Sequence, residues 1–154
     1  MSYPTSSRIP AFLALVVLLA LSASIAQAEG EAFIWTADDP DLEWMSCPWE
    51  PAPEGCEFAV IQGDPAERNA DVLLKLPPNS KFAHHKHTSA ERMVLIAGKF
   101  KVDYVDQDPV TMRAGTYAYG PAKLPHTAYC LDKGDCILFI AFEKPADVIA
   151  VDKE

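Results

Sequence analysis

Three of the chain's four histidines and one carboxylate stand close together in the segment His84-His85-Lys86-His87-Thr88-Ser89-Ala90-Glu91. Side chains alternate across a β-strand, so His85 and His87 would point to one face of an extended segment and His84 to the other. Glu91 follows after a short break, at the start of the next apolar run, where a turn would bring its carboxylate beside the two imidazoles. The imidazole pair forms half of a metal site.

The fourth histidine, His126, lies far along the sequence within another strand-like run. Three imidazole nitrogens and one carboxylate oxygen suit a divalent ion such as Fe(II), Mn(II), Ni(II), Co(II) or Zn(II). We therefore predict one divalent metal ion, Fe(II), Mn(II) or Zn(II), held by His85, His87, Glu91 and His126. The alternative is that the histidines are ordinary polar core residues, because an HxH pair taken alone is a weak signal. Catalytic residues stay unassigned, because Glu91 is committed to the metal and no separate general acid or base is evident.

The elements that would position these residues are short. From Phe33 onward, β-rich runs alternate with Pro, Gly, Asp and Asn, without a long stretch of helical periodicity. Many short, evenly spaced strands predict an all-β barrel or sandwich. Residues 38–55, rich in Pro, Asp and Trp, are interpreted as an ordered arm over the barrel. The predicted strands are residues 33–36, 57–62, 71–77, 81–87, 91–96, 99–105, 110–112, 116–120, 125–131, 136–143 and 147–151.

Two β-hairpins are predicted on either side of the histidine segments. The first covers residues 93–104 and turns at Ala97-Gly98, where glycine supplies the positive φ that a tight connection needs. The second covers residues 129–137 and turns at Asp132-Lys133-Gly134.

The histidine segment resembles the first motif of the cupin superfamily. That motif has Gly, five residues, HxH, three or four residues, Glu, six residues and Gly. Asn79, His85, His87, Glu91 and Gly98 stand at those positions, with Asn in place of the first Gly. Asn tolerates a left-handed backbone better than other non-glycine residues, so this turn is expected to survive.

The second cupin motif has Gly, five residues, Pro, one residue, Gly, two residues, His, three residues and Asn. Gly115, Pro121, Lys123, His126 and Cys130 occupy those places. Lysine accommodates a positive φ poorly, so the loop around Lys123 is expected to be shaped differently. Its ammonium would be an ordinary surface charge or would reach an anionic ligand at the barrel mouth.

The resemblance implies a small single-domain cupin, of the type-2 or ChrR-like kind, to which the segment Gly63-Asp64-Pro65 is also similar. The expected fold is all-β, a single double-stranded β-helix (jelly-roll) barrel with an N-terminal arm. Residues 29–56 would form an N-terminal strand and the Pro/Trp-rich arm, and residues 57–154 the barrel. Many cupins pair through edge strands, so a homodimer is expected by analogy.

The resemblance also sets out the candidate functions. The leading one is an Fe(II)-dependent dioxygenase that acts on a small chelating organic molecule such as a diketone, an enediol or a thiol. A second is a non-catalytic module that binds a metal or a small ligand, as in zinc-binding anti-sigma factors. A third is a Mn(II) or Zn(II) Lewis-acid isomerase or decarboxylase.

The first 28 residues have the pattern of a secretory signal peptide. Arg8 precedes an apolar run over residues 9–21, and the small residues Ala26-Gln27-Ala28 follow. A membrane anchor is the alternative, but the apolar stretch is shorter than the roughly 20 residues of a spanning helix. We therefore expect cleavage near Ala28, no stable membrane anchor, and a periplasmic or extracellular protein.

The chain is acidic, with 22 Asp and Glu against 13 Lys and Arg and a net charge of −9. An acidic surface repels phosphate backbones and anionic headgroups, so nucleic acid is not an expected partner. A small-molecule ligand or substrate is expected instead.

Four cysteines remain in a chain bound for an oxidising compartment, where cysteines usually form disulfides. Three connectivities are possible. Local pairing, Cys47 with Cys56 and Cys130 with Cys136, is favoured because the second pair flanks a tight turn. The alternatives are free buried thiols and a zinc site, the latter disfavoured because CxxC spacing is absent.

Overall fold

The computed structural model describes residues 32–152, and the predicted signal peptide lies outside these residues. All the strands belong to one compact unit that begins at Ile34. The described residues contain no α-helix. The predicted strand at residues 33–36 is wrong, because this segment pairs with nothing, and the first strand is the short β1. The strands are β1 (Met45–Ser46), β2 (Glu57–Gln62), β3 (Ala70–Leu76), β4 (Lys81–Lys86), β5 (Glu91–Ala97), β6 (Lys99–Tyr104), β7 (Val110–Arg113), β8 (Tyr117–Gly120), β9 (His126–Cys130), β10 (Cys136–Phe142) and β11 (Ile149–Ala150).

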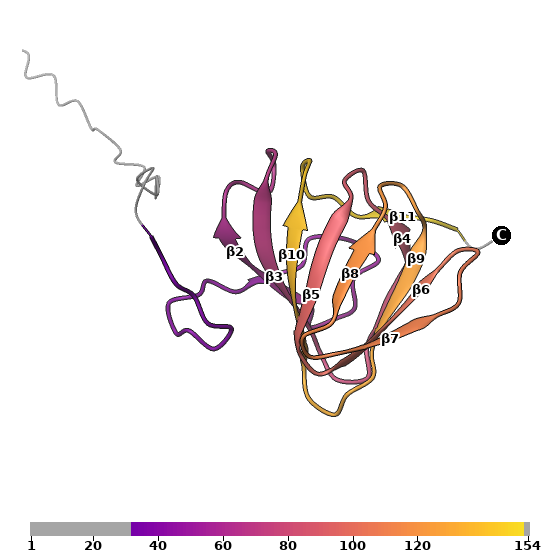
Figure 1. Ribbon diagram of the computed structural model, residues 1–154, viewed down its shortest axis with the longest axis horizontal. Coiled ribbons are helices and arrows are strands. Elements are labelled where there is room, and N and C mark those ends of the chain that lie inside the picture. Colours follow the sequence, from indigo (N-terminus) through magenta and orange to yellow (C-terminus); the bar gives the residue numbers. More distant parts are fainter. Residues whose placement is uncertain (1–31, 153–154) are drawn as a thin grey trace, which may run out of the picture. The chain divides into compact units, whose positions relative to one another are not determined.

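The strands form two antiparallel sheets. One has the order β1-β2-β3-β10-β5-β8 and the other β11-β4-β9-β6-β7, and Figure 1 shows them as two walls of a barrel. Alternate side chains of each strand point between the walls: on β10 Cys136, Leu138, Ile140 and Phe142 are buried, whereas the residues between them are half-buried. This period of two confirms the expected all-β jelly-roll barrel with its apolar core between the sheets.

Neither predicted hairpin forms. β5 pairs with β10 and β8, whereas β6 pairs with β9 and β7, so the turn at Gly98 carries the chain from one sheet to the other. The turn between β9 and β10 also crosses between the sheets. Both turns lie at the same end of the barrel, because a Cβ on Gly98 would come within 2.9 Å of the Asp135 carbonyl oxygen. Turn residues therefore indicated where the chain reverses, but not which strands pair.

Both favoured disulfides are present, joining Cys47 to Cys56 and Cys130 to Cys136. The second pair is buried and connects β9 of one sheet to β10 of the other. The first closes a loop in the segment that precedes the barrel. Cross-links of this kind stabilise a fold by restricting the unfolded chain.

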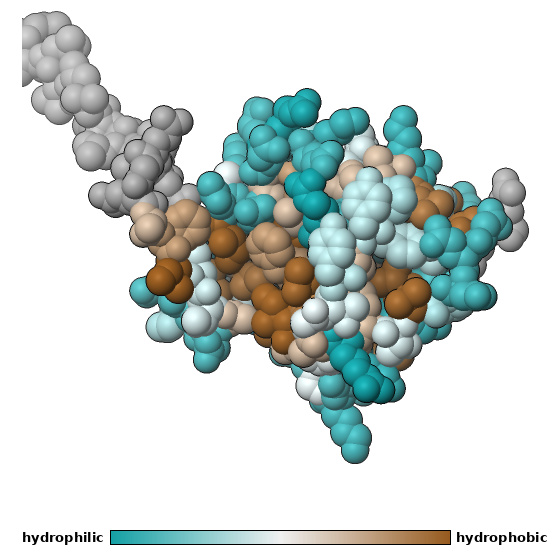
Figure 2. Space-filling model, viewed as in Figure 1, coloured by the Kyte–Doolittle hydropathy of each residue, from teal (hydrophilic) through white to brown (hydrophobic). Residues whose placement is uncertain are grey.

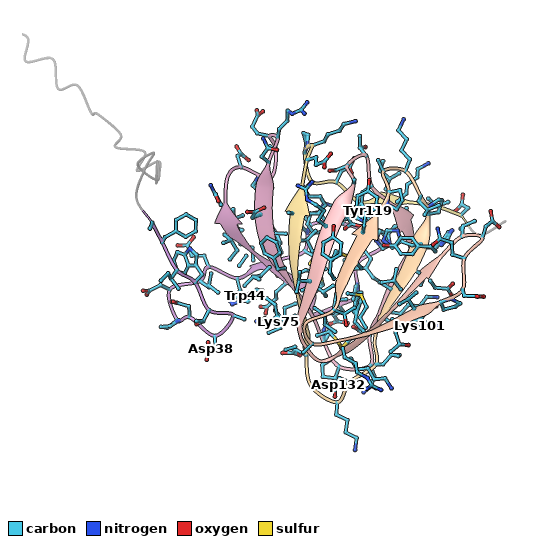
Figure 3. All side chains as sticks on the ribbon, in the orientation of Figure 1. Asp38, Trp44, Lys75, Lys101, Tyr119 and Asp132 are labelled. Atoms are coloured by element: carbon cyan, nitrogen blue, oxygen red, sulfur yellow. A yellow bond between two sulfur atoms is a disulfide. The ribbon has the colours of Figure 1, made fainter. Side chains whose placement is uncertain are left out.

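The segment of residues 34–56, which we call the arm, packs against the six-stranded sheet. Leu42 is buried with Ala59 and Leu73 in a small apolar cluster. The ammonium of Lys75 lies 3.9 Å from the ring centroid of Trp44, and Figure 3 shows these two side chains side by side. In Figure 2 hydrophobic side chains gather where the arm meets this sheet. Within residues 32–152, no helix has the length and apolar character needed to cross a membrane.

Candidate metal centre

The strand register brings the predicted metal ligands to one end of the barrel. His85 on β4 lies opposite His126 on β9, and Glu91 at the start of β5 lies opposite Phe142 on β10. His87 follows directly after β4. All four predicted ligands are buried.

A β-bulge aims His85 inward. The pairing of β4 with β9 shifts register between Phe82 and His85, so two residues three positions apart both point into the barrel. Their rings lie 4.4 Å apart, centroid to centroid. A bulge of one extra residue reverses the side-chain alternation beyond it, and this changes which face a side chain occupies. His84 points to the other side, where its Nδ1 lies 3.3 Å from the Thr127 hydroxyl.

The donor atoms converge. One ring nitrogen from each of His85, His87 and His126 lies within 4.8 Å of the other two. Glu91 Oε1 is 3.3 Å from His87 Nε2, and Glu91 Oε2 is 3.7 Å from His126 Nε2. The structure therefore brings all four predicted ligands together around one point.

Backbone carbonyls fix the tautomer of all three histidines. His85 Nδ1 donates to the Ala83 carbonyl at 2.6 Å, His87 Nδ1 to the Asp147 carbonyl at 2.5 Å and His126 Nδ1 to the Leu124 carbonyl at 3.1 Å. A carbonyl accepts and never donates, so the proton sits on Nδ1 and each Nε2 keeps a free lone pair. His87 Nε2 is buried without a hydrogen-bond partner among the described residues. Such an orphaned lone pair fits a metal ion, which needs no donor hydrogen.

The electrostatics of the site favour neutral imidazoles. Burial and, to a lesser extent, the neighbouring His126 lower the pKa of His85 to about 3. Burial also lowers the pKa of His87 and of His126. Burial raises the pKa of Glu91 to about 7. Near neutral pH the imidazoles are therefore neutral and able to bind a cation. The buried Glu91 carboxyl lacks a positive partner that would stabilise its ionised form, and a metal ion would supply that charge.

The loop between His87 and Glu91 is tied to the segment before β11. The backbone N–H and the hydroxyl of Thr88 donate to the Asp147 carboxylate at 2.7 and 2.5 Å. The buried Ser89 hydroxyl accepts from the backbone N–H groups of residues 143 and 144 at 3.0 and 3.1 Å. Sequence reasoning missed Asp147, because nothing local marks a residue that acts on a histidine 60 positions away.

Two of the three departures from the cupin motifs, Asn79 and Lys123, keep a left-handed backbone; the third is Cys130. Asn79 adopts φ 54°, as expected. Lys123 adopts φ 67°, so the expectation of a differently shaped loop is wrong. Its backbone N–H donates to the His87 carbonyl at 2.8 Å. That hydrogen bond joins the second motif to the first and holds the lysine backbone in the left-handed region.

Tyr104, a half-buried residue whose hydroxyl is buried, also lies beside the site. Its ring lies 5.0 Å from that of His126, and its hydroxyl has no hydrogen-bond partner among the described residues. Burial and the nearby Glu91 carboxylate raise its pKa, so it stays protonated.

An apolar cavity of about 40 Å³ opens beside the four ligands. Its size leaves room for one to a few water molecules, since a water needs roughly 10–15 Å³ on this measure. Tyr117 and Tyr119 on β8 are exposed and do not line this cavity, and Figure 3 shows Tyr119 on that strand. Apart from the four predicted ligands, the lining consists of Trp49, Phe58, Val72, Leu74, Phe82, Met93, Ala128, Leu138, Ile140, Phe142, Asp147 and Val148.

Comparisons with known proteins identify a family and a fold. Residues 42–145 match the ChrR cupin-like domain family. Curated proteins yield no sequence match to the chain.

Among solved structures, the chain is similar to the polyketide cyclase RemF from Streptomyces resistomycificus, at 17% identity and a TM-score of 0.64 over 79% of this chain and 88% of the cyclase. It is similar to Bacillus subtilis oxalate decarboxylase OxdC at 21% identity and a TM-score of 0.58, over 72% of this chain but only 30% of the decarboxylase. A cupin of the RmlC-like kind from Shewanella frigidimarina gives 19% identity and a TM-score of 0.56, over 69% of this chain and 86% of the other. At these identities the likeness shows the fold.

Proposed function

We propose that this chain binds one divalent metal ion through His85, His87, Glu91 and His126. The chain belongs to the ChrR cupin-like domain family, and its proposed activity is that of an exported Fe(II)-dependent dioxygenase. Its substrate would be a small chelating organic molecule. The observation that carries the proposal is the convergence of three buried Nε2 lone pairs, each fixed by a backbone carbonyl, on one carboxylate in an apolar cavity.

The donor set fits the proposed metal. Three neutral nitrogens and one oxygen occupy four positions of a six-coordinate ion, which leaves two for a chelating molecule. Fe(II), when bound, supplies redox chemistry toward dioxygen. Fe(II) is proposed over Zn(II) on the family resemblance, and the metal-binding part of the proposal does not depend on that choice. Bacillus subtilis oxalate decarboxylase, to which the chain is similar in fold, has Mn(II) centres.

The residues of the chain have separate roles in this scheme. Glu91 supplies the only negative charge among the four ligands, so it offsets part of the charge of the ion. The backbone carbonyls of Ala83, Asp147 and Leu124 orient the three imidazoles. The apolar wall, with Met93 and Phe142, excludes water from the reacting positions, which strengthens electrostatic interactions there.

A non-catalytic metal-binding module is the second candidate. It is favoured by the cavity lining, in which Asp147 is the only ionisable residue besides the four predicted ligands among the described residues. The Asp147 carboxylate already accepts two hydrogen bonds from Thr88. Within residues 32–152, the cavity lining therefore offers no free carboxylate or imidazole as a base for a Lewis-acid reaction.

Metal analysis and oxygen uptake distinguish the two candidates. Protein purified from its native compartment would be analysed for metals, then assayed for oxygen uptake with a β-diketone and with a small thiol. Bound iron with substrate-dependent oxygen uptake supports the dioxygenase. Bound zinc without turnover contradicts it and supports the binding module. Absence of any bound metal, with no binding on reconstitution, would contradict both.

Export is proposed on the signal-peptide pattern of residues 1–28, and it is supported by the two disulfides, which are typical of oxidising compartments. The mass of the mature protein tests it. Cleavage after Ala28 is the expected result, and a full-length mature chain in the cytoplasm would contradict it. A homodimer stays a proposal by analogy, to be tested by light scattering.

A further inference from the structure

Part of the lining of the metal cavity comes from outside the barrel strands. Trp49, in the arm, lines the cavity together with Phe58 on β2 and Phe82 on β4. The rings of Trp49 and Phe58 lie 5.3 Å apart, centroid to centroid. An indole from the arm therefore forms part of the apolar lining of the site.

The loop that carries Trp49 is closed and tethered. The Cys47–Cys56 disulfide joins its ends, and the backbone N–H of Cys47 donates to the Cys56 carbonyl at 3.0 Å. Ala83 N–H donates to the Pro51 carbonyl at 3.1 Å. The carbonyl of that same Ala83 accepts from His85 Nδ1. The loop and one metal-site histidine thus share a residue of β4.

Trp49 lines two hollows. A second and wider hollow of about 370 Å³ lies within the arm, lined by residues 46–50 and 52–56. Trp49 is the residue that the linings of the two hollows have in common. The inner hollow, at about 40 Å³, holds only a few waters. A molecule larger than a few waters needs more room than the inner hollow has, and the outer hollow, which Trp49 also lines, offers space into which the indole could move.

We propose that Trp49 is the specificity-determining residue of this site: its indole admits compact apolar chelators and excludes long ones, and the Cys47–Cys56 disulfide limits how far it swings. The inference rests on the proposed metal site. It adds that selection by size resides in the arm rather than in the barrel wall.

Two chelators that differ only in their tails test this. Acetohydroxamate and octanohydroxamate would be titrated into the Co(II)-loaded protein and followed by the visible Co(II) bands. The parent protein is expected to bind the short hydroxamate at least about tenfold more tightly, a difference of roughly 1.4 kcal/mol. Trp49→Ala removes that preference. Trp44→Ala, the matched control in the same arm, keeps it because Trp44 packs against Lys75 away from the cavity.

The disulfides provide a second, independent comparison. Replacing both Cys47 and Cys56 by Ala is expected to strengthen octanohydroxamate binding severalfold, because the loop is released. Replacing both Cys130 and Cys136 by Ala is expected to leave the preference unchanged. An unchanged preference in Trp49→Ala, or an equal change in Trp44→Ala, overturns the proposal.

A failure of the metal site would be recognised separately. Co(II) affinity is measured first. A parent protein that binds no Co(II) contradicts the proposed metal site but not the role proposed for Trp49. That role is then tested on the metal-free protein with toluene. Toluene is expected to raise the unfolding temperature of Trp49→Ala but not of the parent or of Trp44→Ala, and an equal response of all three proteins overturns it.

Discussion

The two ends of the barrel interior are built from different side chains. At one end, which we call the filled end, β10 begins at Cys136, opposite Leu76. Leu76 and Leu95, which are among the largest fully buried residues, lie there. At the other, the metal end, β10 finishes at Phe142 opposite Glu91, and the buried groups are three imidazoles and a carboxylate beside a cavity. Close-packed apolar contacts stabilise a fold, whereas buried polar groups cost stability unless they are paired.

This difference assigns stability to one end and binding to the other. The filled end also carries the disulfide between the sheets and the turn at Gly98. The metal end is held by hydrogen bonds from loops, such as those from Thr88 to Asp147 and from Lys123 to His87. Changes at the two ends should therefore affect different measurements.

The largest expected effect is the loss of metal binding on removing a ligand. His126→Ala should lower Co(II) affinity by more than about 100-fold, since even residues that only orient a ligand are worth 10–100-fold. The free energy of unfolding of the metal-free protein should change by less than about 1 kcal/mol, because a buried imidazole with an unpaired nitrogen adds little stability. Calorimetric titration and urea unfolding measure the two quantities.

His84→Ala is the matched control for this prediction, because His84 lies on the other face of β4. It should leave Co(II) affinity unchanged within about twofold, which is less than 0.5 kcal/mol. Equal losses in the two variants would contradict the four-ligand assignment.

The opposite pattern is expected at the filled end. Leu95 is fully buried on β5, so Leu95→Ala should lower the free energy of unfolding by about 3–4 kcal/mol through lost burial and a cavity. Co(II) affinity should stay within about twofold of the parent. Val94→Ala, at a half-buried neighbouring position, should cost less than about 1.5 kcal/mol. A loss of Co(II) affinity in folded Leu95→Ala would mean that the two ends are coupled.

The stability of the metal end should depend on pH through Glu91. Its pKa is raised from 4.5 to about 7 by burial, so its stabilising contribution is fully present below pH 4.5 and is lost as the pH rises through 7. The difference of 2.5 between these two pKa values corresponds to a change of at most about 3 kcal/mol in the free energy of unfolding. The histidines act oppositely, because a lowered pKa loses stability as the pH falls below 6.5.

Glu91→Gln isolates the carboxyl. In the metal-free protein at pH 8 this variant should be more stable than the parent by up to about 3 kcal/mol, and the two should converge below pH 4.5. Urea unfolding from pH 4 to pH 8 measures this. Parallel stability curves for the two proteins would show that Glu91 titrates normally in the fold.

The sequence allowed the metal end to be predicted in more detail than the connections. The spacing of His85, His87, Glu91 and His126 predicted a common site, and these side chains do converge. Most strand positions were also predictable, because alternation of apolar residues is a local property. The all-β cupin fold follows from these two signals together.

The partners of the strands were not predictable. A glycine turn reports only the local backbone, so Gly98 indicated a hairpin where the chain in fact changes sheets. The bulge between Phe82 and His85 depends on pairing with β9 and leaves no mark in the sequence. The contact of His87 with Asp147 and the place of Trp49 in the cavity lining likewise depend on long-range packing.

The smallest expected effect concerns the turn that joins the two motifs. Lys123 is held at φ 67° by its hydrogen bond to the His87 carbonyl, and a left-handed backbone costs a non-glycine residue about 1–2 kcal/mol. Lys123→Gly should therefore raise the free energy of unfolding by about 1 kcal/mol. This is the strain that glycine relieves, less the entropy that glycine adds to the unfolded chain. Lys123→Ala keeps the strain and should stay within about 0.5 kcal/mol of the parent. If Lys123→Ala stabilised the protein as much as Lys123→Gly, the lysine side chain rather than the left-handed backbone would be what lowers the free energy of unfolding. The stability of the metal end would then depend on surface charge at this turn and not on the backbone conformation.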